Sequence, residues 1–308
     1  MLARSRGLQP HSTLLLTGAS GFVGGFVRQE ARCIPLSLNG KEVDLRNVRD
    51  TNDAIDQIRP DAVLHLAAQT FVPRSFDDPL ETFEINFLGT YNLLAALKKI
   101  GFAGRFLLVS TGDAYGSVAP ELLPITEAQP PRPRNPYAVS KVAAEALCFQ
   151  WNQTAGFETM IARPFNHVGP GQREDFVISG FAKQIAAIKH GARPAVIEAG
   201  DLDVTRDFLD VRDVVRAYLL LLQDGHAGET YNICSGTERS IRSLLEKMLE
   251  LAEVDAEIKI NPAKFRPLEQ RRVVGDASKL CRHTGWQPSY SIEQTLQDTI
   301  HSWEYQTA

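Results

Sequence analysis

Cysteine and histidine are too sparse in this sequence to suggest a metal centre. The 308 residues include only four cysteines, which lie far apart, and seven histidines. Neither residue type shows the spacing of metal ligands, so we expect no metal. We also expect the thiols to be reduced, as is typical of a cytoplasmic protein. The cysteines are Cys33, Cys148, Cys234 and Cys281.

The sequence also lacks a surplus of basic residues and long apolar runs. Its 33 Lys and Arg residues are outnumbered by 37 Asp and Glu residues, which gives a formal net charge of -4 at pH 7. This balance does not suit binding to a phosphate backbone, so nucleic acid is not expected as a partner. No apolar stretch is long enough for a signal peptide or a membrane span, so we expect no membrane contact. Residues 1–10 are expected to form a loose tail.

Short apolar runs alternate with segments of helical character in the first half of the chain. Continuous apolar strands separated by helices indicate a parallel sheet that is covered on both faces. We therefore predict an α/β fold with a doubly wound parallel (Rossmann) sheet over residues 11–165. The predicted strands are 12–17, 62–67, 105–110 and 158–162, and the predicted helices are 22–32, 80–100 and 137–154.

The second half has a looser pattern, with a Gly/Pro-rich run at 167–172 followed by separate helical pieces. We expect residues 166–308 to form mainly a smaller, substrate-binding lobe, with some segments returning to the Rossmann domain. No proline-rich linker divides the halves, so the ligand is expected in the crevice between them. The helical pieces are 176–191, 211–222 and 241–252.

A glycine-rich turn lies between the first predicted strand and the first predicted helix. Gly18, Gly21 and Gly24 form the pattern G-x-x-G-x-x-G. Backbone N–H groups at a helix N-terminus attract a pyrophosphate, and residues without side chains let it approach. An ordinary glycine-rich turn is the alternative, but the order of strand, turn and helix favours a dinucleotide site. We assign Phe22 and Val23 to the same site.

The segment that follows bears on the choice of cofactor. Many dinucleotide sites have an acid about 20 residues after the glycines, which binds the adenosine ribose and disfavours a 2′-phosphate. Here residues 38–40 read Leu-Asn-Gly, so NADP(H) is favoured and NAD(H) remains possible. Arg28 or Arg32 can reach the extra phosphate, or both can be solvated helix residues. Asp44 and Leu45 are expected to contact the adenine, unless the aspartate only caps a turn.

Three polar residues, on a predicted helix and after a predicted strand, suit a catalytic site. Tyr137 and Lys141 form Y-x-x-x-K at the start of a helix, which places them on one face a turn apart. A neighbouring ammonium favours the phenolate, so we expect Lys141 to lower the pKa of the tyrosine. Thr111 follows an apolar strand, which puts its hydroxyl at the carboxyl edge of the sheet. There it can bind a substrate carbonyl or simply cap a turn.

These motifs together resemble the extended short-chain dehydrogenases/reductases that modify nucleotide-sugars. The resemblance implies NAD(P)H-dependent reduction of the 4-keto group of GDP-4-dehydro-6-deoxy-D-mannose to GDP-D-rhamnose, with a GDP-linked sugar as the substrate. It covers nearly the whole chain. The matching segments are TGASGFVG (17–24), HLAAQ (65–69), STGDAYG (110–116), YAVSK (137–141), RPFNHVGPGQ (163–172), RDFLDVRDVVRAY (206–218), YNICSG (231–236) and TGWQP (284–288).

Matching the family's motifs position by position implies roles for individual residues. The catalytic trio falls on Thr111, Tyr137 and Lys141, and the last two also contact the cofactor. Further cofactor contacts fall on Leu66, Ala67 and Ala68, and the substrate contacts fall on Thr111, Gly112, Asp113, Asn166, Arg206 and Glu269. Two of the substrate contacts have an alternative: Arg206 can form a salt bridge with the neighbouring Asp207, and Glu269 can be a surface acid.

The sequence departs from the related 4,6-dehydratases at one informative position. Those enzymes carry a glutamate two residues after the catalytic threonine, whereas this chain has Gly112 and Asp113. An aspartate is one methylene shorter, and a misplacement of about 1 Å can lower a rate on the order of a hundredfold. Reduction is therefore favoured over dehydration. A 4-epimerase, a 4,6-dehydratase and a non-catalytic NADP-binding sensor remain alternatives.

The resemblance also implies a homodimer. Relatives commonly pair through a four-helix bundle, which here would be built from the predicted helices 80–100 and 137–154. The second helix has an apolar face at Ala143, Leu147 and Trp151 that permits such a contact. The sheet can bury the same face instead.

Overall fold

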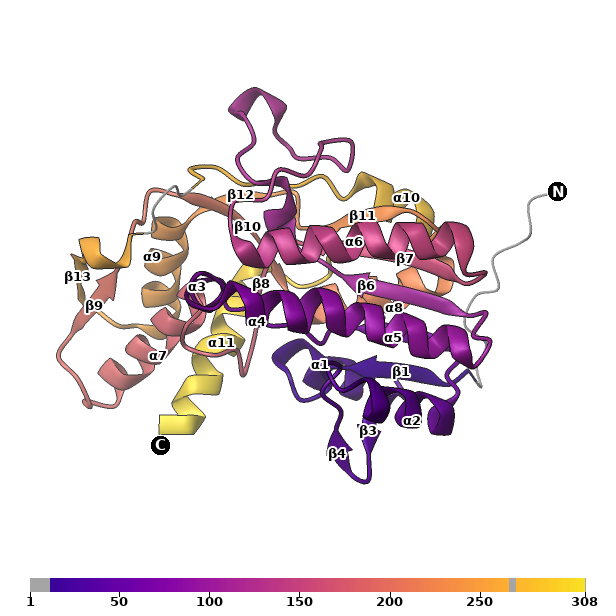
Figure 1. Cartoon of the computed structure of the whole chain (residues 1–308). Helices are drawn as coiled ribbons and strands as arrows, with labels where there is room; N and C mark the ends of the chain where they lie inside the picture. The colour runs from indigo at the N-terminus through magenta and orange to yellow at the C-terminus, as the bar shows by residue number, and fades with distance from the viewer. Residues whose placement is uncertain (1–11, 266–269, 308) are drawn as a thin grey trace.

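A six-stranded parallel sheet forms the centre of the computed structural model, which describes residues 12–265 and 270–307 (Figure 1). The strand order is β11-β7-β6-β5-β1-β2, and all neighbouring pairs are parallel. The predicted doubly wound α/β fold is therefore confirmed. The strands are β1 (Leu14–Thr17), β2 (Ile34–Pro35), β5 (Ala62–His65), β6 (Arg105–Val109), β7 (Glu158–Pro164) and β11 (Thr230–Ile233).

Helices cover both faces of this sheet. Successive side chains of a strand point to opposite sides, so each apolar strand contributes to a core on both faces. Leu15 packs in one core with α2 (Val48–Ile58), α5 (Gly89–Lys99) and α6 (Pro136–Thr154). Its neighbours Leu14 and Leu16 pack in the opposite core. That second core is covered by α1 (Phe22–Glu30), α8 (Val211–Asp224) and α10 (Ser278–Thr284).

The predicted helix 80–100 is interrupted by a π-helical turn. It consists of α4 (Pro79–Phe83), the π-helical segment η1 (Glu84–Leu88) and α5. Within η1, the Asn86 amide is buried: its Oδ1 accepts from the backbone N–H of Gln69 at 2.8 Å, and its Nδ2 donates to Ser140 Oγ at 2.9 Å. Such turns are often found at functional sites.

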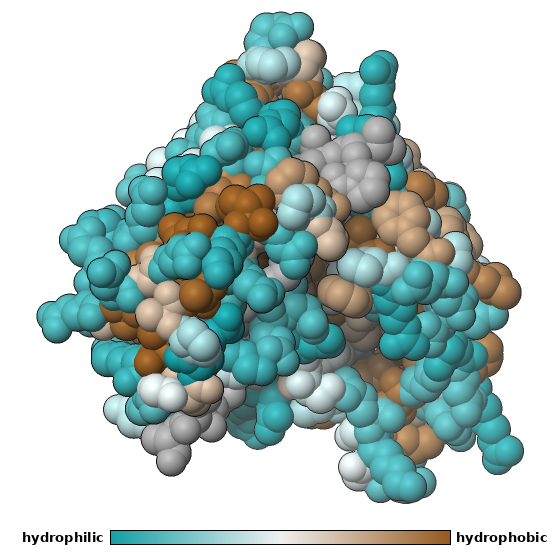
Figure 2. Space-filling model, turned by 90° about the vertical axis from the view of Figure 1, so that its left-hand side faces the viewer, coloured by the Kyte–Doolittle hydropathy of each residue, from teal (hydrophilic) through white to brown (hydrophobic). Residues whose placement is uncertain are grey.

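A smaller group of elements lies beside the central sheet and has its own core. It contains the three-stranded sheet β12-β10-β8 and the strand pair β13-β9. Figure 2 shows this end of the molecule, whose mostly hydrophilic surface carries separate apolar patches and is hollowed near its centre. The elements are α7 (Val177–Lys189), α9 (Ile241–Ala252), α11 (Ile292–Thr307), β8 (Asn166–Val168), β9 (Val196–Ala199), β10 (Thr205–Asp210), β12 (Glu238–Ser240) and β13 (Glu257–Ile260).

Two shorter features lie in the first half of the chain. The strands β3 (Ser37–Leu38) and β4 (Lys41–Glu42) form a hairpin after β2, and α3 (Val72–Asp77) precedes α4. Throughout residues 12–265 and 270–307, each helix is either too short or too polar to cross a bilayer.

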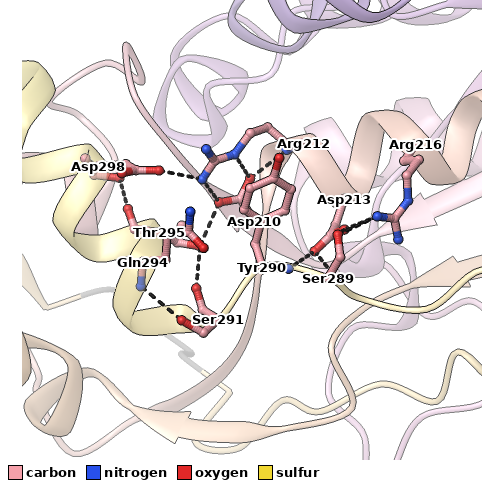
Figure 3. A network of polar contacts seen from close by, with 11 residues as sticks. Asp210, Arg212, Asp213, Arg216, Ser289, Tyr290, Ser291, Gln294, Thr295 and Asp298 are labelled. Carbon is pink, nitrogen blue, oxygen red and sulfur yellow. Dashed lines mark hydrogen bonds and ion pairs between the residues drawn. The ribbon is translucent and has the colours of Figure 1, made fainter.

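A polar network ties α8 to α11 and to the loop that precedes α11 (Figure 3). The fully buried Asp213 carboxylate accepts from the backbone N–H groups of Ser289 and Tyr290 at 2.9 and 3.0 Å. Arg212 donates to both Asp210 and Asp298 at 2.7 Å. Its guanidinium also lies 3.8 Å from the centre of the Tyr290 ring. The network therefore fixes the smaller group of elements against the central sheet.

The Asp213→Ala variant should be markedly less stable than the wild type. It removes the charged acceptor of the part-buried N–H groups of Ser289 and Tyr290, and each hydrogen bond to a charged group contributes about 1.5–3 kcal/mol. We expect urea denaturation to show a loss of about 2–4 kcal/mol. Asp203→Ala is the control, because Asp203 pairs with Arg242 at the surface, where such pairs contribute under about 1 kcal/mol. Equal losses in the two variants would contradict this account.

Candidate active site

The predicted site residues follow directly after strands of the central sheet. Gly18 follows β1, Leu66 follows β5, and Thr111 lies two residues beyond β6. Asn166 lies two residues beyond β7. The carboxyl ends of parallel strands meet at one edge, where ligands bind in open α/β sheets. The topology therefore brings the predicted cofactor and catalytic segments to the same edge.

In the glycine turn after β1, a side chain at Gly18 or Gly24 would collide with the backbone. Gly18 has a φ of +68°, and a Cβ there would lie 2.8 Å from the Ala67 backbone nitrogen. A Cβ on Gly24 would lie 2.2 Å from the Gly18 carbonyl oxygen. Gly21 closes the turn, since its N–H donates to the Gly18 oxygen at 3.1 Å. Gly18 and Gly24 thus each have a structural reason to be glycine.

The turn fits a dinucleotide pyrophosphate. Helix α1 begins at Phe22 without a side-chain cap and without an acid in its first turn. Its first N–H groups are therefore available to an anion, and the helix dipole favours negative charge at this end. The segment 66–68 lies against the turn, because the Gly18 backbone packs closely on Leu66 and Ala67. Val23, in the first turn of α1, is half-buried.

An acid does approach the turn, although the sequence spacing did not reveal it. Residues 38–40 lie in the β3–β4 hairpin, where Asn39 has a φ of 52° and Gly40 a φ of 77°. Beyond this tight turn the hairpin brings the Glu42 carboxylate to Ser20, whose Oγ donates to it at 2.6 Å. The hairpin therefore places a carboxylate beside the glycine turn, and this residue type disfavours a 2′-phosphate where it meets the adenosine ribose.

The four residues predicted to contact the adenosine part of the cofactor differ in burial and in their hydrogen bonds. The Asp44 carboxylate accepts from Arg46 at 2.7 Å, and this hydrogen bond lowers its pKa. Leu45 is buried, and its carbonyl accepts from Asn92 Nδ2 at 2.8 Å. Arg28 and Arg32 are exposed near the end of α1. The contacts of all four with a cofactor stay predictions.

Thr111 and Tyr137 are brought together at the edge of the sheet. The Tyr137 phenol is almost fully buried, and burial is the main reason why its pKa lies well above the usual 10. The Asp113 carboxylate raises the pKa further, and hydrogen bonding with the Thr111 hydroxyl lowers it. The Thr111 Oγ1 also accepts from the Asp113 backbone N–H at 3.1 Å.

Lys141 is buried one turn beyond Tyr137 on α6. Burial lowers the pKa of its ammonium to about 8, against a smaller opposing effect of Cys148 and Glu145. Lys141 is not among the groups that shift the phenol pKa. The structure thus differs from the expectation that Lys141 lowers this pKa, because removal of the phenol from water has the larger effect.

A buried ion pair, missed in the sequence, anchors the catalytic helix to the sheet. Glu145 on α6 accepts from Arg163 Nε at 2.9 Å and Nη2 at 2.6 Å, and also from the Ser110 hydroxyl. The Arg163 guanidinium lies 4.7 Å from the centre of the Tyr115 ring. The available signal was the position of Glu145, four residues after Lys141 and on the same helix face.

The residues expected to face the sugar follow Thr111. A Cβ at Gly112 would lie 3.3 Å from the Phe165 ring, so a larger residue there would require a small shift of its neighbours. Asp113 is exposed, and it is close enough to raise the pKa of Tyr137. The aspartate that replaces the dehydratase glutamate therefore faces the phenol region of the site.

The residues expected to hold the nucleotide are only partly described. Asn166 is exposed at the start of β8. The Arg206 Nη1 donates to the carbonyls of Thr205 and Gln270 at 2.7 and 2.9 Å. Asp207 instead accepts from the backbone N–H groups of residues 235, 236 and 275. Glu269 lies outside the described residues.

His167 is a further residue at the site that the sequence analysis did not single out. Its ring is parallel to that of Phe22, with an interplanar angle of 2° and 6.3 Å between the centroids. His167 therefore lies beside the start of α1. Burial lowers its pKa, and its Nδ1 lies 3.1 Å from the Phe165 carbonyl oxygen. Its place in the Gly/Pro-rich run after Asn166 was the only signal.

Comparison with known proteins identifies close relatives of this chain. The profile of the GDP-mannose 4,6 dehydratase family matches residues 36–299. The GDP-6-deoxy-D-mannose reductase of Pseudomonas aeruginosa is 50% identical over 295 residues, which cover 94% of this chain and 97% of that protein. These matches span most of the chain, so they include both the central sheet and the smaller group of elements.

Solved structures agree with this similarity. The structure of RMD from Pseudomonas aeruginosa complexed with NADPH has 48% sequence identity and a TM-score of 0.91, covering 96% of this chain and 99% of that one. The UDP-glucose 4-epimerase of Thermotoga maritima with UDP-glucose has 26% identity and a TM-score of 0.87, covering 96% of this chain and 100% of that one. The same fold thus carries both reductases and epimerases.

The Gly24→Ala variant should bind reduced dinucleotide more weakly than the wild type by at least about tenfold, a change of about 1.4 kcal/mol. The new Cβ would lie 2.2 Å from the Gly18 oxygen and would force the turn to shift. Gly25→Ala is the matched control, because a Cβ at Gly25 meets nothing within 4 Å. Titration of the nicotinamide fluorescence measures both affinities. A Gly24→Ala variant that binds as tightly as Gly25→Ala would contradict the role of the turn.

The Lys141→Met variant should be more stable than the wild type at neutral pH. The lysine pKa falls from 10.5 to about 8 on folding, so the wild type is destabilised below pH 8 and recovers stability as the pH rises toward 10.5. This shift corresponds to about 3 kcal/mol. Urea denaturation at pH 7 and pH 10 should therefore show a large difference between the two proteins that shrinks at high pH. A difference independent of pH would rule out a buried ammonium.

Proposed function

The chain belongs to the GDP-mannose 4,6 dehydratase family of extended short-chain dehydrogenases/reductases, and from this premise we propose that it is an NAD(P)H-dependent reductase. It reduces the 4-keto group of GDP-4-dehydro-6-deoxy-D-mannose to give GDP-D-rhamnose. The near full-length identity to the Pseudomonas aeruginosa reductase carries this proposal. NADP(H) is the favoured cofactor, with NAD(H) possible, and the NADPH complex of the related RMD supports this choice.

The glycine turn at the start of α1 holds the pyrophosphate, with contacts from the segment 66–68. The bound reduced dinucleotide supplies the hydride that adds to carbon 4 of the sugar. Asp44 and Leu45 lie toward the adenine, and Tyr137 and Lys141 border the nicotinamide ribose. The fit rests on the uncapped N–H groups of α1 and on a turn in which Gly18 and Gly24 leave no room for a Cβ.

Tyr137 delivers the proton that completes the reduction. Its raised pKa keeps the phenol protonated at neutral pH, so the proton is available when the carbonyl oxygen gains negative charge. The Thr111 hydroxyl, beside the phenol, orients that oxygen. The Lys141 ammonium, a turn away on α6, binds the nicotinamide ribose. Carbon 4 thus gains the hydride, and its oxygen gains the phenol proton.

The nucleotide part of the substrate is held by Asn166, Arg206 and Glu269. Arg206 suits a diphosphate, because a guanidinium presents its donors in a planar fork. A carboxylate at Glu269 can accept from a guanine edge or a ribose hydroxyl. On this view residues 11–165 form the dinucleotide domain, and residues 166–308 form mainly the substrate lobe.

The second candidate is a 4,6-dehydratase or a 4-epimerase of the same family. The match to the dehydratase profile and the closeness of Asp113 to the phenol favour it over a non-catalytic sensor. Both of these activities begin by oxidising the sugar and therefore need an oxidised cofactor at the start. Retention of NAD(P)⁺ through purification would support the second candidate, whereas net consumption of NAD(P)H supports the reductase.

We place the protein in the cytoplasm as a homodimer. All four cysteines are free thiols, in keeping with a reducing compartment. The helices α4, α5 and α6 carry large apolar side chains that are exposed, among them Leu80 at 69% and Phe149 at 55% exposure. Exposed apolar patches of this kind mark protein contacts, and a second copy of the chain is the partner we propose.

The activity and the role of Tyr137 are tested together. Purified protein with the keto-sugar nucleotide should consume NADPH, followed by the absorbance of the reduced nicotinamide. The Tyr137→Phe variant should lose at least about 100-fold in kcat, because general acid catalysis contributes about 10²–10⁴. Its dinucleotide affinity should stay near the wild-type value. A fully active variant would refute the role of Tyr137, and no consumption by the wild type would refute the reductase.

The Phe149→Glu variant should convert the proposed dimer into a monomer. A charge at the centre of an apolar interface is costly to bury without a partner. Sedimentation equilibrium measures the mass of the wild type and of the variant. Ile260→Glu is the control, because Ile260 is also an exposed apolar residue but lies on β13, away from α5 and α6. A wild type that sediments as a monomer would overturn the proposed pairing.

A further inference from the structure

A buried histidine lies directly beneath the predicted dinucleotide site. His65, the last residue of β5, is only 1% exposed and lies between two threonine hydroxyls. Its Nδ1 is 2.7 Å from Thr17 Oγ1, and its Nε2 is 2.9 Å from Thr90 Oγ1. We propose that His65 is a positioning residue that holds the glycine turn in the shape that binds the dinucleotide. This proposal rests on the function proposed above.

The hydrogen bonds of the two threonines determine the state of the imidazole. The Thr90 hydroxyl donates to the Asn86 carbonyl at 2.7 Å, so it can only accept from His65. Nε2 therefore carries the proton, and Nδ1 accepts from the Thr17 hydroxyl. The Thr17 oxygen in turn accepts from the Ala67 N–H at 3.1 Å. A single direction of donation thus runs from Ala67 to Asn86 through a neutral imidazole.

The neutral form is the stable one in this place. Burial, together with a smaller effect of the nearby Lys141 ammonium, lowers the pKa of His65 to about 3. A second proton would sit on Nδ1 and would remove the acceptor of the Thr17 hydroxyl. The chain of hydrogen bonds therefore persists throughout the neutral pH range.

The first hydrogen bond of this series, between Ala67 and Thr17, determines the position of the glycine turn. Thr17 immediately precedes Gly18, and the Gly18 backbone packs so closely on the next segment that a Cβ would lie 2.8 Å from the Ala67 nitrogen. The Thr17 hydroxyl bonds that same nitrogen. Loss of the imidazole would free this hydroxyl to rotate, and the two predicted cofactor segments would lose their common anchor.

At its other end, this series of hydrogen bonds reaches α6, the helix that carries Tyr137. Asn86 Nδ2 donates to Ser140 Oγ at 2.9 Å, and Ser140 Oγ donates to the Tyr137 carbonyl at 2.7 Å. All of these groups are buried. His65 thus connects the turn that binds the dinucleotide to the helix that carries the phenol, through the π-helical segment η1.

The test uses two buried threonines that differ in one respect. Thr90 and Thr299 are both fully buried in helices, and each hydroxyl donates to the carbonyl four residues earlier at 2.7 Å. Only Thr90 also accepts from His65. We expect Thr90→Val to weaken NADPH binding about tenfold, in line with the cost of a buried donor left unpaired. Thr299→Val should bind NADPH like the wild type, although both variants lose thermal stability.

A double-mutant cycle then shows whether the imidazole couples the two threonines. If His65 links them, the Thr17→Val/Thr90→Val variant should bind NADPH only slightly more weakly than either single variant. If Thr17→Val does not fold, His65→Gln and His65→Asn replace it, since each retains one half of the bridge, and both should bind NADPH more weakly. Unchanged NADPH affinity in Thr90→Val, or additive losses, would overturn the role of His65. A wild type that does not bind NADPH would instead overturn the proposed function.

Discussion

The site depends on one geometric constraint, the meeting of parallel strands at a common carboxyl edge. The strands β1, β5, β6 and β7 all end there, and each is followed within two residues by a segment assigned to the cofactor, the catalytic trio or the substrate. Ligands of open α/β sheets bind at this edge because the helix N-termini and loops that follow the strands gather around it. The convergence therefore requires no unusual local structure beyond the glycine turn.

This edge is held in place by buried polar contacts. The series of hydrogen bonds that runs from Ala67 through His65 to Asn86 joins the glycine turn to η1. The ion pair Glu145–Arg163 joins α6 to β7. Buried polar groups are costly unless they are satisfied, so such networks fix one arrangement of the surrounding elements. The bound cofactor and the phenol thereby keep a constant relation, as hydride and proton transfer to one carbonyl group require.

The sequence predicted those parts of the molecule that are encoded locally. The strand and helix order, the motif glycines and the Y-x-x-x-K helix are all short-range patterns. The partners of His65 and Glu42 are separated from them by between 22 and 48 residues, so no spacing rule indicated them. The π-helical turn has no hydrophobic period of its own. The direction of the phenol pKa was also missed, because it depends on burial in the folded chain.

The raised pKa of the Tyr137 phenol suits reduction, because the phenol then starts out protonated. A reductase must start with a protonated acid, whereas an enzyme that first oxidises the sugar must start with a base. The most direct measurement uses dinucleotide carrying deuterium at the transferable nicotinamide position, with the sugar product examined by NMR. We expect one deuterium at carbon 4 of the sugar for each dinucleotide consumed. Product without deuterium at carbon 4, or turnover without net consumption of the dinucleotide, would contradict it.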